Sequence, residues 1–283
     1  MSDFVEIVEM CPRDGLQNEA AHVPTAQKID LVNRISDCGF KRVEVTSFVS
    51  PKWVPQLADA AQVMAAIARA PNTSYGVLTP NVQGFDRAAD TRPDWVAVFA
   101  SASEGFSKAN LNCSISESLE RFRPVLTAAD TARIPVRGYV SCITDCPYDG
   151  PVAPAAVADV TKALLDMGCH EIGLGDTIGH ATPETTGPML DAVLDIARPD
   201  QLGGHFHDTG GRALDNIDLC LSRGMRSFDA SLGGLGGCPY APGAKGNVAT
   251  EAVLDRLDAL GFATGLDRNA IQSAAIFAKG LRR

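Results

Sequence analysis

The sequence is poor in cysteine, in net positive charge and in long apolar runs. Its 283 residues include eight cysteines, and no two of them form a C-x-x-C pair. This content excludes a disulfide-rich secreted scaffold and the common zinc-ribbon patterns, so we expect reduced thiols. The formal net charge is −9, which provides no overall basic field to attract nucleic acid or an anionic membrane.

No apolar stretch is long enough to span a bilayer, which takes about 20 residues. The first residues also lack the basic and apolar segments of a secretion signal,. These absences predict a cytoplasmic protein with no membrane and no nucleic-acid partner. Apolar residues make up 45% of the chain and charged residues 21%, a balance that excludes intrinsic disorder and supplies a large core.

Short β-rich segments alternate with segments of helical spacing along the whole chain. The predicted strands cover residues 4–9, 42–46, 74–79, 95–101, 135–141, 169–176, 203–208 and 227–232. The predicted helices cover residues 26–38, 116–132, 154–167, 183–197, 216–223, 248–260 and 267–279. This alternation indicates parallel βαβ units, and eight of them fit an α/β fold, the (β/α)8 TIM barrel. We predict a single barrel domain over residues 1–283, with an extra C-terminal helix.

A doubly wound open sheet is the competing fold. That fold is expected to carry a glycine-rich phosphate-binding turn directly after its first strand. The corresponding segment here reads Cys11-Pro-Arg-Asp-Gly15, which lacks the fingerprint. The barrel is therefore the fold that we predict.

In a barrel of this kind, functional groups gather at the carboxyl ends of the strands. Candidate functional residues lie near the end of, or shortly after, the first, second, seventh and eighth predicted strands. They are Arg13, Asp14, Glu44, His205, His207, Cys238 and Asn247. These four strands are neighbours in a closed barrel, because the eighth strand pairs with the first, so we expect the side chains to meet at one mouth.

The sequence His205-Phe-His207 suggests half of a metal site. Side chains alternate along a strand, so the two imidazoles face the same way. Two core histidines with hydrogen-bond partners are the simpler alternative. Because Asp14 and Asn247 can converge on them, we favour a ligand set of Asp14, His205, His207 and Asn247. This mixture of oxygen and imidazole donors suits Mg²⁺ or Mn²⁺.

Arg13 and Glu44 allow a catalytic and a structural interpretation. Arg13 is permanently charged and can stabilise an oxyanion beside a metal, or it can form a structural ion pair with Asp14 or Glu44. Glu44 can orient a ligand or Arg13, or serve only as the partner in that ion pair. Asp14 alone would also fit an ordinary turn before Gly15.

Residues 233–246 contain six glycines among fourteen residues. Such a segment changes its backbone angles cheaply and lies where a barrel enzyme carries a lid. Cys238 in this segment can exchange a proton with a substrate when the lid closes, since an ordinary thiol is mostly protonated at neutral pH. An inert cysteine in a glycine-rich loop is the alternative.

Several motifs together carry a resemblance to a known family. They are Pro12–Glu19, Thr46–Pro55, Gly175–Gly179, His205–Thr209, and Gly234–Tyr240 with Gly246-Asn247. Over essentially its whole length the chain resembles the 3-hydroxy-3-methylglutaryl-CoA lyase family, within the metal-dependent barrel lyases and Claisen-type synthases. The stretch Gly-Leu-Gly-Gly-Cys-Pro is typical of the lyases and separates them from the related synthases.

The resemblance implies cleavage of 3-hydroxy-3-methylglutaryl-CoA to acetyl-CoA and acetoacetate, a step of leucine breakdown, in a protein that can be a homodimer. The implied metal ligands are Asp14, His205, His207 and Asn247. The implied catalytic residues are Arg13 for the enolate, Glu44 as its support, and Cys238 for protonation of the product. From the chemistry we expect Asp14 or His205 to take the hydroxyl proton, and we favour His205 because imidazole titrates near neutral pH, although a nitrogen bound to a metal cannot also carry the proton. As contacts to the acyl-CoA substrate we expect Arg13, Gln17 and Asn110.

Three positions depart from the pattern of the family. Gln83, Gly173 and Gly210 stand where the resemblance leads us to expect Lys, Ser and Tyr. Because two of these changes remove side chains, they put the acyl group in question, and citramalyl-CoA or a longer 3-substituted glutaryl-CoA is an alternative substrate. A Claisen-type synthase or aldolase of the same fold, and an inactive barrel that binds acyl-CoA, are the competing functions.

Overall fold

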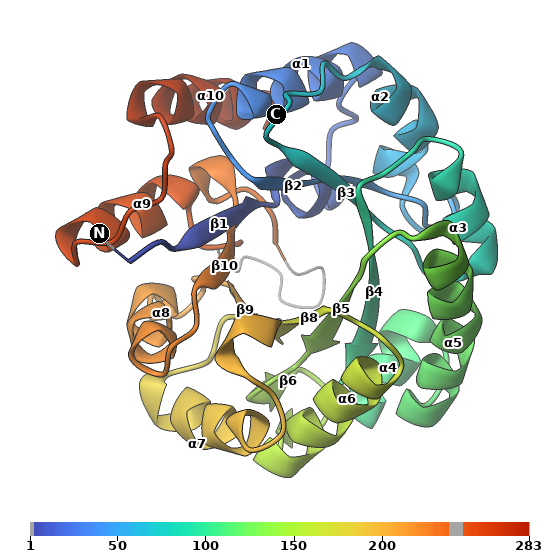
Figure 1. Ribbon diagram of the computed structural model, residues 1–283, viewed down its shortest axis with the longest axis vertical. Coiled ribbons are helices and arrows are strands. Elements are labelled where there is room, and N and C mark those ends of the chain that lie inside the picture. Colours follow the sequence, from blue (N-terminus) through green and yellow to red (C-terminus); the bar gives the residue numbers. More distant parts are fainter. Residues whose placement is uncertain (1–2, 238–245, 283) are drawn as a thin grey trace.

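The computed structural model describes residues 3–237 and 246–282 and shows a closed barrel of parallel strands surrounded by helices (Figure 1). The barrel strands follow one another around the ring in chain order, and the last pairs with the first. They are β1 (Glu6–Glu9), β2 (Arg42–Ser47), β3 (Ser74–Leu78), β4 (Trp95–Ser101), β5 (Val136–Ser141), β8 (Glu171–Asp176), β9 (Leu202–Phe206) and β10 (Ser227–Ala230). The predicted TIM barrel is confirmed.

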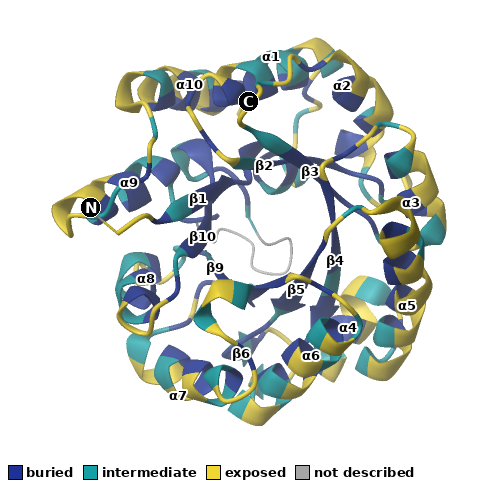
Figure 2. Cartoon of the chain, viewed as in Figure 1, coloured by how far each residue is buried: buried dark blue, intermediate teal, exposed yellow. Residues whose placement is uncertain are grey.

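Helices cover the outside of the barrel, and their outer faces are exposed while the strands are buried (Figure 2). They are α1 (Thr25–Ser36), α2 (Ala60–Ala66), α3 (Val82–Ala89), α4 (Glu104–Leu111), α5 (Ile115–Ala132), α6 (Pro154–Asp166), α7 (Pro183–Leu194), α8 (Ala213–Ser222), α9 (Thr250–Ala259) and α10 (Arg268–Leu281). The predicted extra C-terminal helix is α10, which packs beside α1.

All eight predicted strands are present, and their ends differ from the predicted ones by at most two residues. The strand predicted for residues 203–208 ends at Phe206, because His207 turns away to form an antiparallel bridge with Asn247. The helix predicted from residue 116 begins one residue earlier. Its cap is Ser114, whose hydroxyl accepts from the Glu117 backbone N–H at 3.2 Å while the Glu117 carboxylate accepts from the Ser114 N–H at 2.8 Å.

The sequence did not predict three helices, α2, α3 and α4, or a small hairpin formed by β6 (Asp145–Cys146) and β7 (Gly150–Pro151). These helices have seven or eight residues each, which is too short for helical periodicity to show clearly. Single turns of 3-10 or π-helix follow some strands, and the turn at Cys11–Gly15 directly follows β1 and carries two of the predicted site residues.

Two kinds of packing hold the barrel. Apolar side chains fill the layer between the strands and the helices. Inside the barrel, one side is apolar, with Trp95 lying so close to Gly76 that a Cβ there would come within 2.0 Å of the indole ring. The other side is charged, with Arg137 of β5 and Asp229 of β10 both buried. Asp229 of this charged side contacts His205, one of the predicted functional residues.

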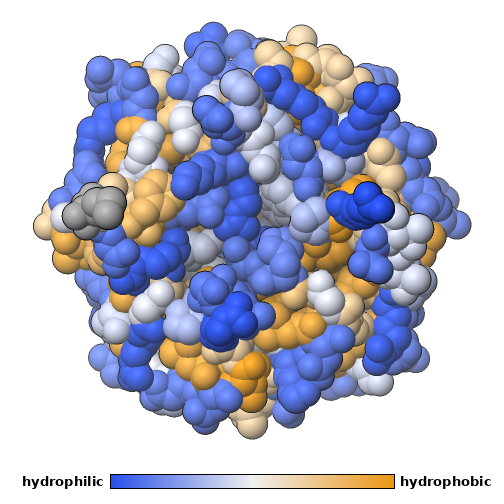
Figure 3. Space-filling model, viewed as in Figure 1, coloured by the Kyte–Doolittle hydropathy of each residue, from blue (hydrophilic) through white to orange (hydrophobic). Residues whose placement is uncertain are grey.

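The surface is mostly hydrophilic, and in the view of Figure 3 polar side chains gather over the centre and much of the rim. The large apolar side chains exposed on the described surface are Phe4, Trp53, Tyr148, Ile196, Leu260 and Ile276. Among the described residues, no helix combines the length and the apolar character that crossing a bilayer requires.

Candidate active site

Three predicted metal ligands meet at the carboxyl end of the barrel. Asp14 lies in the turn after β1, His205 in β9, and His207 directly after β9. The Asp14 Oδ2 atom lies 4.0 Å from Nε2 of His205 and 3.9 Å from Nε2 of His207. One donor atom from each residue fits within 4.8 Å of the others, so the three side chains can bind one small cation.

The protonation states of two of these groups suit metal binding, which needs deprotonated ligands. Burial favours a neutral Asp14, but the charges of Arg13, His205 and His207 outweigh it and hold the pKa of this carboxyl well below its usual range. Burial, reinforced by repulsion from His205, lowers the pKa of His207 to about 4. An ionised carboxylate therefore faces a neutral imidazole.

Asn247, the fourth predicted ligand, lies beside Asp14, His205 and His207, which we call the triad. Its Nδ2 atom donates to Asp14 Oδ2 at 2.7 Å and to the Leu235 carbonyl at 3.2 Å. The amide therefore presents its nitrogen to Asp14. Amide nitrogen and oxygen are nearly equal in size, so a half-turn of this group presents an oxygen ligand in the same place.

Arg13 connects the triad to a second carboxylate. Its Nη1 donates to Asp14, and its Nε donates to Oε1 of Glu44. Glu44 is fully buried, and its other oxygen accepts a hydrogen bond of 2.7 Å from the Tyr139 hydroxyl. The ion pair that the sequence allowed is therefore present, and it holds Arg13 beside Asp14, His205 and His207. Tyr139 was not predicted.

His205 has a buried partner of its own. Its Nδ1 lies 3.0 Å from Oδ2 of Asp229, the residue directly beside it on the neighbouring strand. Burial alone lowers the pKa of His205, but the hydrogen bond and charge of Asp229, together with Asp14, raise it above its usual value. A carboxylate on Nδ1 directs Nε2 toward the triad, the arrangement that orients histidine ligands in metal sites. Asp229 was also missed by the sequence analysis.

The structure describes both ends of the glycine-rich segment. The Gly237 carbonyl accepts a hydrogen bond of 2.7 Å from Asn18, and the Gly246 carbonyl accepts one of 2.9 Å from the Asp208 N–H. Asp208 directly follows His207 in the chain, and an added Cβ on Gly236 would lie 3.3 Å from the Asp14 carbonyl oxygen, so both ends of the segment lie next to the triad. Cys238 lies outside the described residues.

This constellation can be compared with known proteins. The model of the family described as HMGL-like matches residues 4–277. The chain belongs to the HMGL-like family.

Three of the compared proteins are 52–62% identical to this chain. The mitochondrial hydroxymethylglutaryl-CoA lyase of Arabidopsis thaliana is 54% identical over 97% of this chain, which spans only 58% of that longer protein. A Pseudomonas aeruginosa protein named 3-hydroxy-3-isohexenylglutaryl-CoA/hydroxy-methylglutaryl-CoA lyase is 52% identical over 95% of this chain and 90% of its own length. The crystal structure of the HMG-CoA lyase of Brucella melitensis has a TM-score of 0.98 at 62% identity, with 99% of each chain covered.

Two further predicted contacts of the HMGL-like chain lie on the same end of the barrel. Gln17 is half-buried just after the Cys11–Gly15 turn, and Asn110 is exposed near the end of α4, which follows β4. Neither belongs to the triad.

The three departures from the family pattern differ in their surroundings. A Cβ on Gly173 would lie 2.5 Å from the Tyr139 ring, so that ring already fills the space of the expected side chain. Gly210 is exposed, and its Cβ would meet only the Gly179 carbonyl, at 3.0 Å. Gln83 is exposed at the start of α3. The absent side chain at position 173 therefore opens no free pocket.

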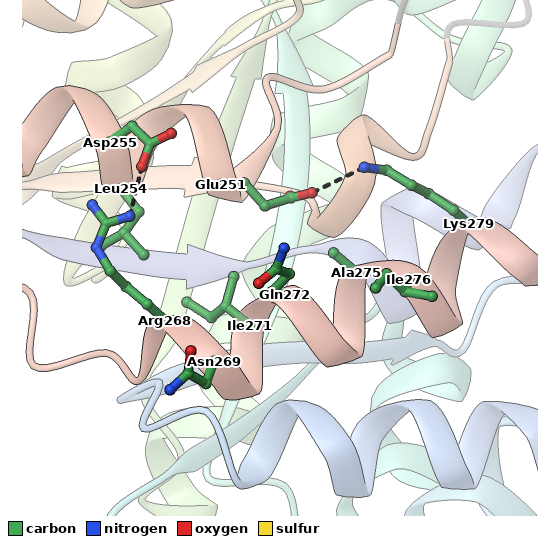
Figure 4. Close-up of a pocket in the computed structure, with 10 residues that line it drawn as sticks. All are labelled: Glu251, Leu254, Asp255, Arg268, Asn269, Ile271, Gln272, Ala275, Ile276 and Lys279. Atoms are coloured by element: carbon green, nitrogen blue, oxygen red, sulfur yellow. Dashed lines mark hydrogen bonds and ion pairs between the residues drawn. The ribbon is translucent and has the colours of Figure 1, made fainter.

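A groove of about 500 Å³ lies outside the barrel, between α9 and α10 (Figure 4). Its charged side chains pair with one another, Glu251 with Lys279 at 3.1 Å and Asp255 with Arg268 at 2.6 Å. It is lined by none of the triad residues. The candidate active site of this HMGL-like chain is the barrel mouth and not this groove.

Proposed function

We propose that this chain is a divalent-cation-dependent carbon–carbon lyase that cleaves 3-hydroxy-3-methylglutaryl-CoA to acetyl-CoA and acetoacetate. The observation that carries the proposal is the meeting of Asp14, His205 and His207 at the barrel mouth with Arg13 beside them. The names of the compared relatives support the substrate. We place the protein in leucine breakdown in the cytoplasm, as a single lyase domain over residues 1–283 that forms a homodimer.

Asp14, His205, His207 and Asn247 would hold the cation. Mg²⁺ or Mn²⁺ fits them best, because the set combines carboxylate and amide oxygens with imidazole and contains no thiolate. When bound, such a cation makes a coordinated hydroxyl more acidic and polarises substrate oxygens.

Residues of the chain itself accept the hydroxyl proton and stabilise the enolate. Asp14 and His205 lie together at the mouth, and we propose that one of the two accepts the proton of the 3-hydroxyl group. As the C2–C3 bond breaks, C3 becomes the ketone of acetoacetate and the bonding electrons pass to the thioester as an enolate. Arg13 donates hydrogen bonds to that enolate oxygen, and Glu44 holds Arg13 in place.

The acetyl-CoA enolate then takes a proton on carbon. We propose Cys238 as its source, since a thiol is mostly protonated at neutral pH and the described ends of its segment lie beside the triad,. Gln17 and Asn110 are proposed contacts to the CoA portion of the substrate, which would leave the mouth over these residues.

The test is to incubate the full-length protein with 3-hydroxy-3-methylglutaryl-CoA, with Mg²⁺ or Mn²⁺ and with excess EDTA. We expect acetoacetate and acetyl-CoA in equal amounts, and only when the cation is present. Cleavage that survives EDTA would contradict the cation requirement. No cleavage under either condition would leave acyl-CoA binding without catalysis as the better description.

A longer 3-substituted glutaryl-CoA is a second candidate substrate, because one compared relative carries such a substrate in its name. The apolar side of the barrel interior supplies a surface for such a substituent, with Val49 and Phe99 as its partly exposed members. Rates with 3-hydroxy-3-methylglutaryl-CoA, citramalyl-CoA and the isohexenyl homologue would decide the acyl group. We expect the methyl compound to be fastest, since Tyr139 fills the space above Gly173.

A further inference from the structure

A chain of buried hydrogen bonds joins the two halves of the site inside the barrel. At its centre is Arg137 of β5, which is fully buried. Its Nη1 atom lies 2.8 Å from the Tyr139 hydroxyl and 2.8 Å from Oδ1 of Asp229. Tyr139 in turn donates to Glu44, and Asp229 holds His205. One nitrogen atom therefore contacts Asp229 directly and is linked to Glu44 through the Tyr139 hydroxyl.

We propose that Arg137 is a positioning residue for the lyase reaction, one that fixes Tyr139 and Asp229 so that Glu44 and His205 keep their relative places at the mouth. The inference rests on the proposed function. A guanidinium is planar, and its donors point in fixed directions, so two acceptors that share one of its nitrogens cannot move independently. Such outer contacts orient metal-binding histidines and tune their affinity.

The surroundings of Arg137 keep its guanidinium in one place. Its Nε forms an ion pair of 2.8 Å with Glu171, so two carboxylates, Glu171 and Asp229, balance the buried charge. A Cβ on Gly203 would lie only 2.5 Å from Nη2 of Arg137, which shows how closely the backbone of β9 supports the group. Among the described residues, Nη2 has no hydrogen-bond partner. An unpaired buried donor is costly, and this cost is consistent with a geometry set by the other contacts of the group.

Arg42 of β2 offers a matched control inside the same barrel. Its Nη2 atom pairs with Glu171 at 2.9 Å and with Glu6 at 2.9 Å. The side chain is 15% exposed and thus also mostly buried. It shares one carboxylate with Arg137, but its ion pairs lead toward Glu6 and away from the triad. Removing this arginine disturbs the same buried network without touching the support of His205.

The experiment compares Arg137→Gln with Arg42→Gln in the full-length protein. For each variant we would measure the Mn²⁺ dissociation constant without substrate, kcat and KM at saturating Mn²⁺, and the thermal midpoint. We expect Arg137→Gln to weaken Mn²⁺ binding and to lower kcat, each by roughly 10–100-fold. Arg42→Gln should change both by less than about threefold. Equal losses in the two variants, or none with Arg137→Gln, would overturn the proposal.

Two milder variants keep the proposal testable if Arg137→Gln does not fold. Tyr139→Phe removes the hydroxyl that links Arg137 to Glu44 and leaves the contacts of Asp229 in place, so kcat should fall while Mn²⁺ affinity stays the same. Asp229→Asn weakens the link between Arg137 and His205, so Mn²⁺ affinity should fall. If both variants lower both quantities to the same extent, Arg137 does not serve two separate supports. Mn²⁺ affinity needs no acyl substrate, so a protein that binds Mn²⁺ but does not cleave the proposed substrate would contradict the function alone.

Discussion

At the scale of single residues, three buried side chains that the sequence analysis did not predict contact the predicted site residues or one another. Asp14, His205 and His207 could be found because polar residues after barrel strands are expected to face the mouth,. Arg137, Tyr139 and Asp229 were missed, although all three follow the same two-residue alternation along their strands. Residues that only fill the barrel interior occupy the same kind of strand position. The contacts that lead to Glu44 and His205 are what distinguish these three.

Replacement of Cys238 by Ser tests the proposed proton donor. We expect Cys238→Ser to lower kcat by about 10²–10⁴-fold, the usual contribution of a general acid, because a hydroxyl gives up its proton far less readily. Mn²⁺ affinity should stay within about threefold of wild type, since this residue is outside the proposed ligand set. Steady-state kinetics and Mn²⁺ titration check both. An unchanged kcat would remove the thiol from the mechanism.

Gly173 tests how tightly the interior near the site is filled. A side chain at this position would overlap the buried Tyr139 ring, so we expect Gly173→Ser to lower the free energy of unfolding by about 1–3 kcal/mol. Gly280→Ser is the control, because an added Cβ there meets nothing within 4 Å. Urea unfolding of both variants gives the comparison. Equal stability of wild type and Gly173→Ser would mean that the ring moves freely.

At the scale of elements, the strands were easier to predict than the helices between them. Runs such as Trp95–Ser101 are buried on both faces and read as continuous β-rich segments,. Helices α2, α3 and α4 are too short to show a periodic apolar face, so their residues looked like loops. The hydrogen bond between Asn18 and Gly237 had no local signal either, because its partners lie 219 residues apart.

The start of α5 provides a test at this scale. Ser114 caps the helix together with Glu117, whereas Ser116 lies one residue inside it and is exposed. We expect Ser114→Ala to cost about 1 kcal/mol of unfolding free energy, the typical value of a lost cap. Ser116→Ala should cost nothing, since alanine is the better helix former. The urea midpoints of the two variants would show the difference. Equal midpoints would contradict Ser114 as the cap of this helix.

At the scale of the whole molecule, Glu9 joins three segments that carry the site. Its carboxyl group accepts hydrogen bonds from the Cys11 and Leu232 N–H groups, both at 2.9 Å, and from the Thr250 hydroxyl at 2.7 Å. Burial outweighs these bonds and raises the pKa of Glu9 from its usual 4.5 to about 8. Between pH 4.5 and about pH 8, Glu9 of the folded protein keeps a proton that Glu9 of the unfolded chain has released.

The free energy of unfolding should therefore decrease as pH rises through this interval. The contribution of Glu9 is fully present below pH 4.5 and is lost above about pH 8. Glu9→Gln cannot ionise and keeps a similar shape, so its stability should fall less steeply between pH 5 and pH 8. Urea unfolding at several pH values in this range, for wild type and variant, measures the two slopes. Parallel slopes would show that Glu9 is already ionised in the folded protein.

The order of strands around the ring has a consequence for biosynthesis. Asp14 and Asn247 are hydrogen-bonded although 233 positions separate them in the chain, and they meet only because β10 closes against β1. A ribosome must release nearly the entire polypeptide before these two groups can come together. Binding of the proposed cation would therefore require a closed barrel, because an incomplete chain lacks Asn247, one of the four proposed ligands. A higher concentration of this cation would then shift the folding equilibrium toward the closed barrel, because the cation binds the closed barrel and not the incomplete one.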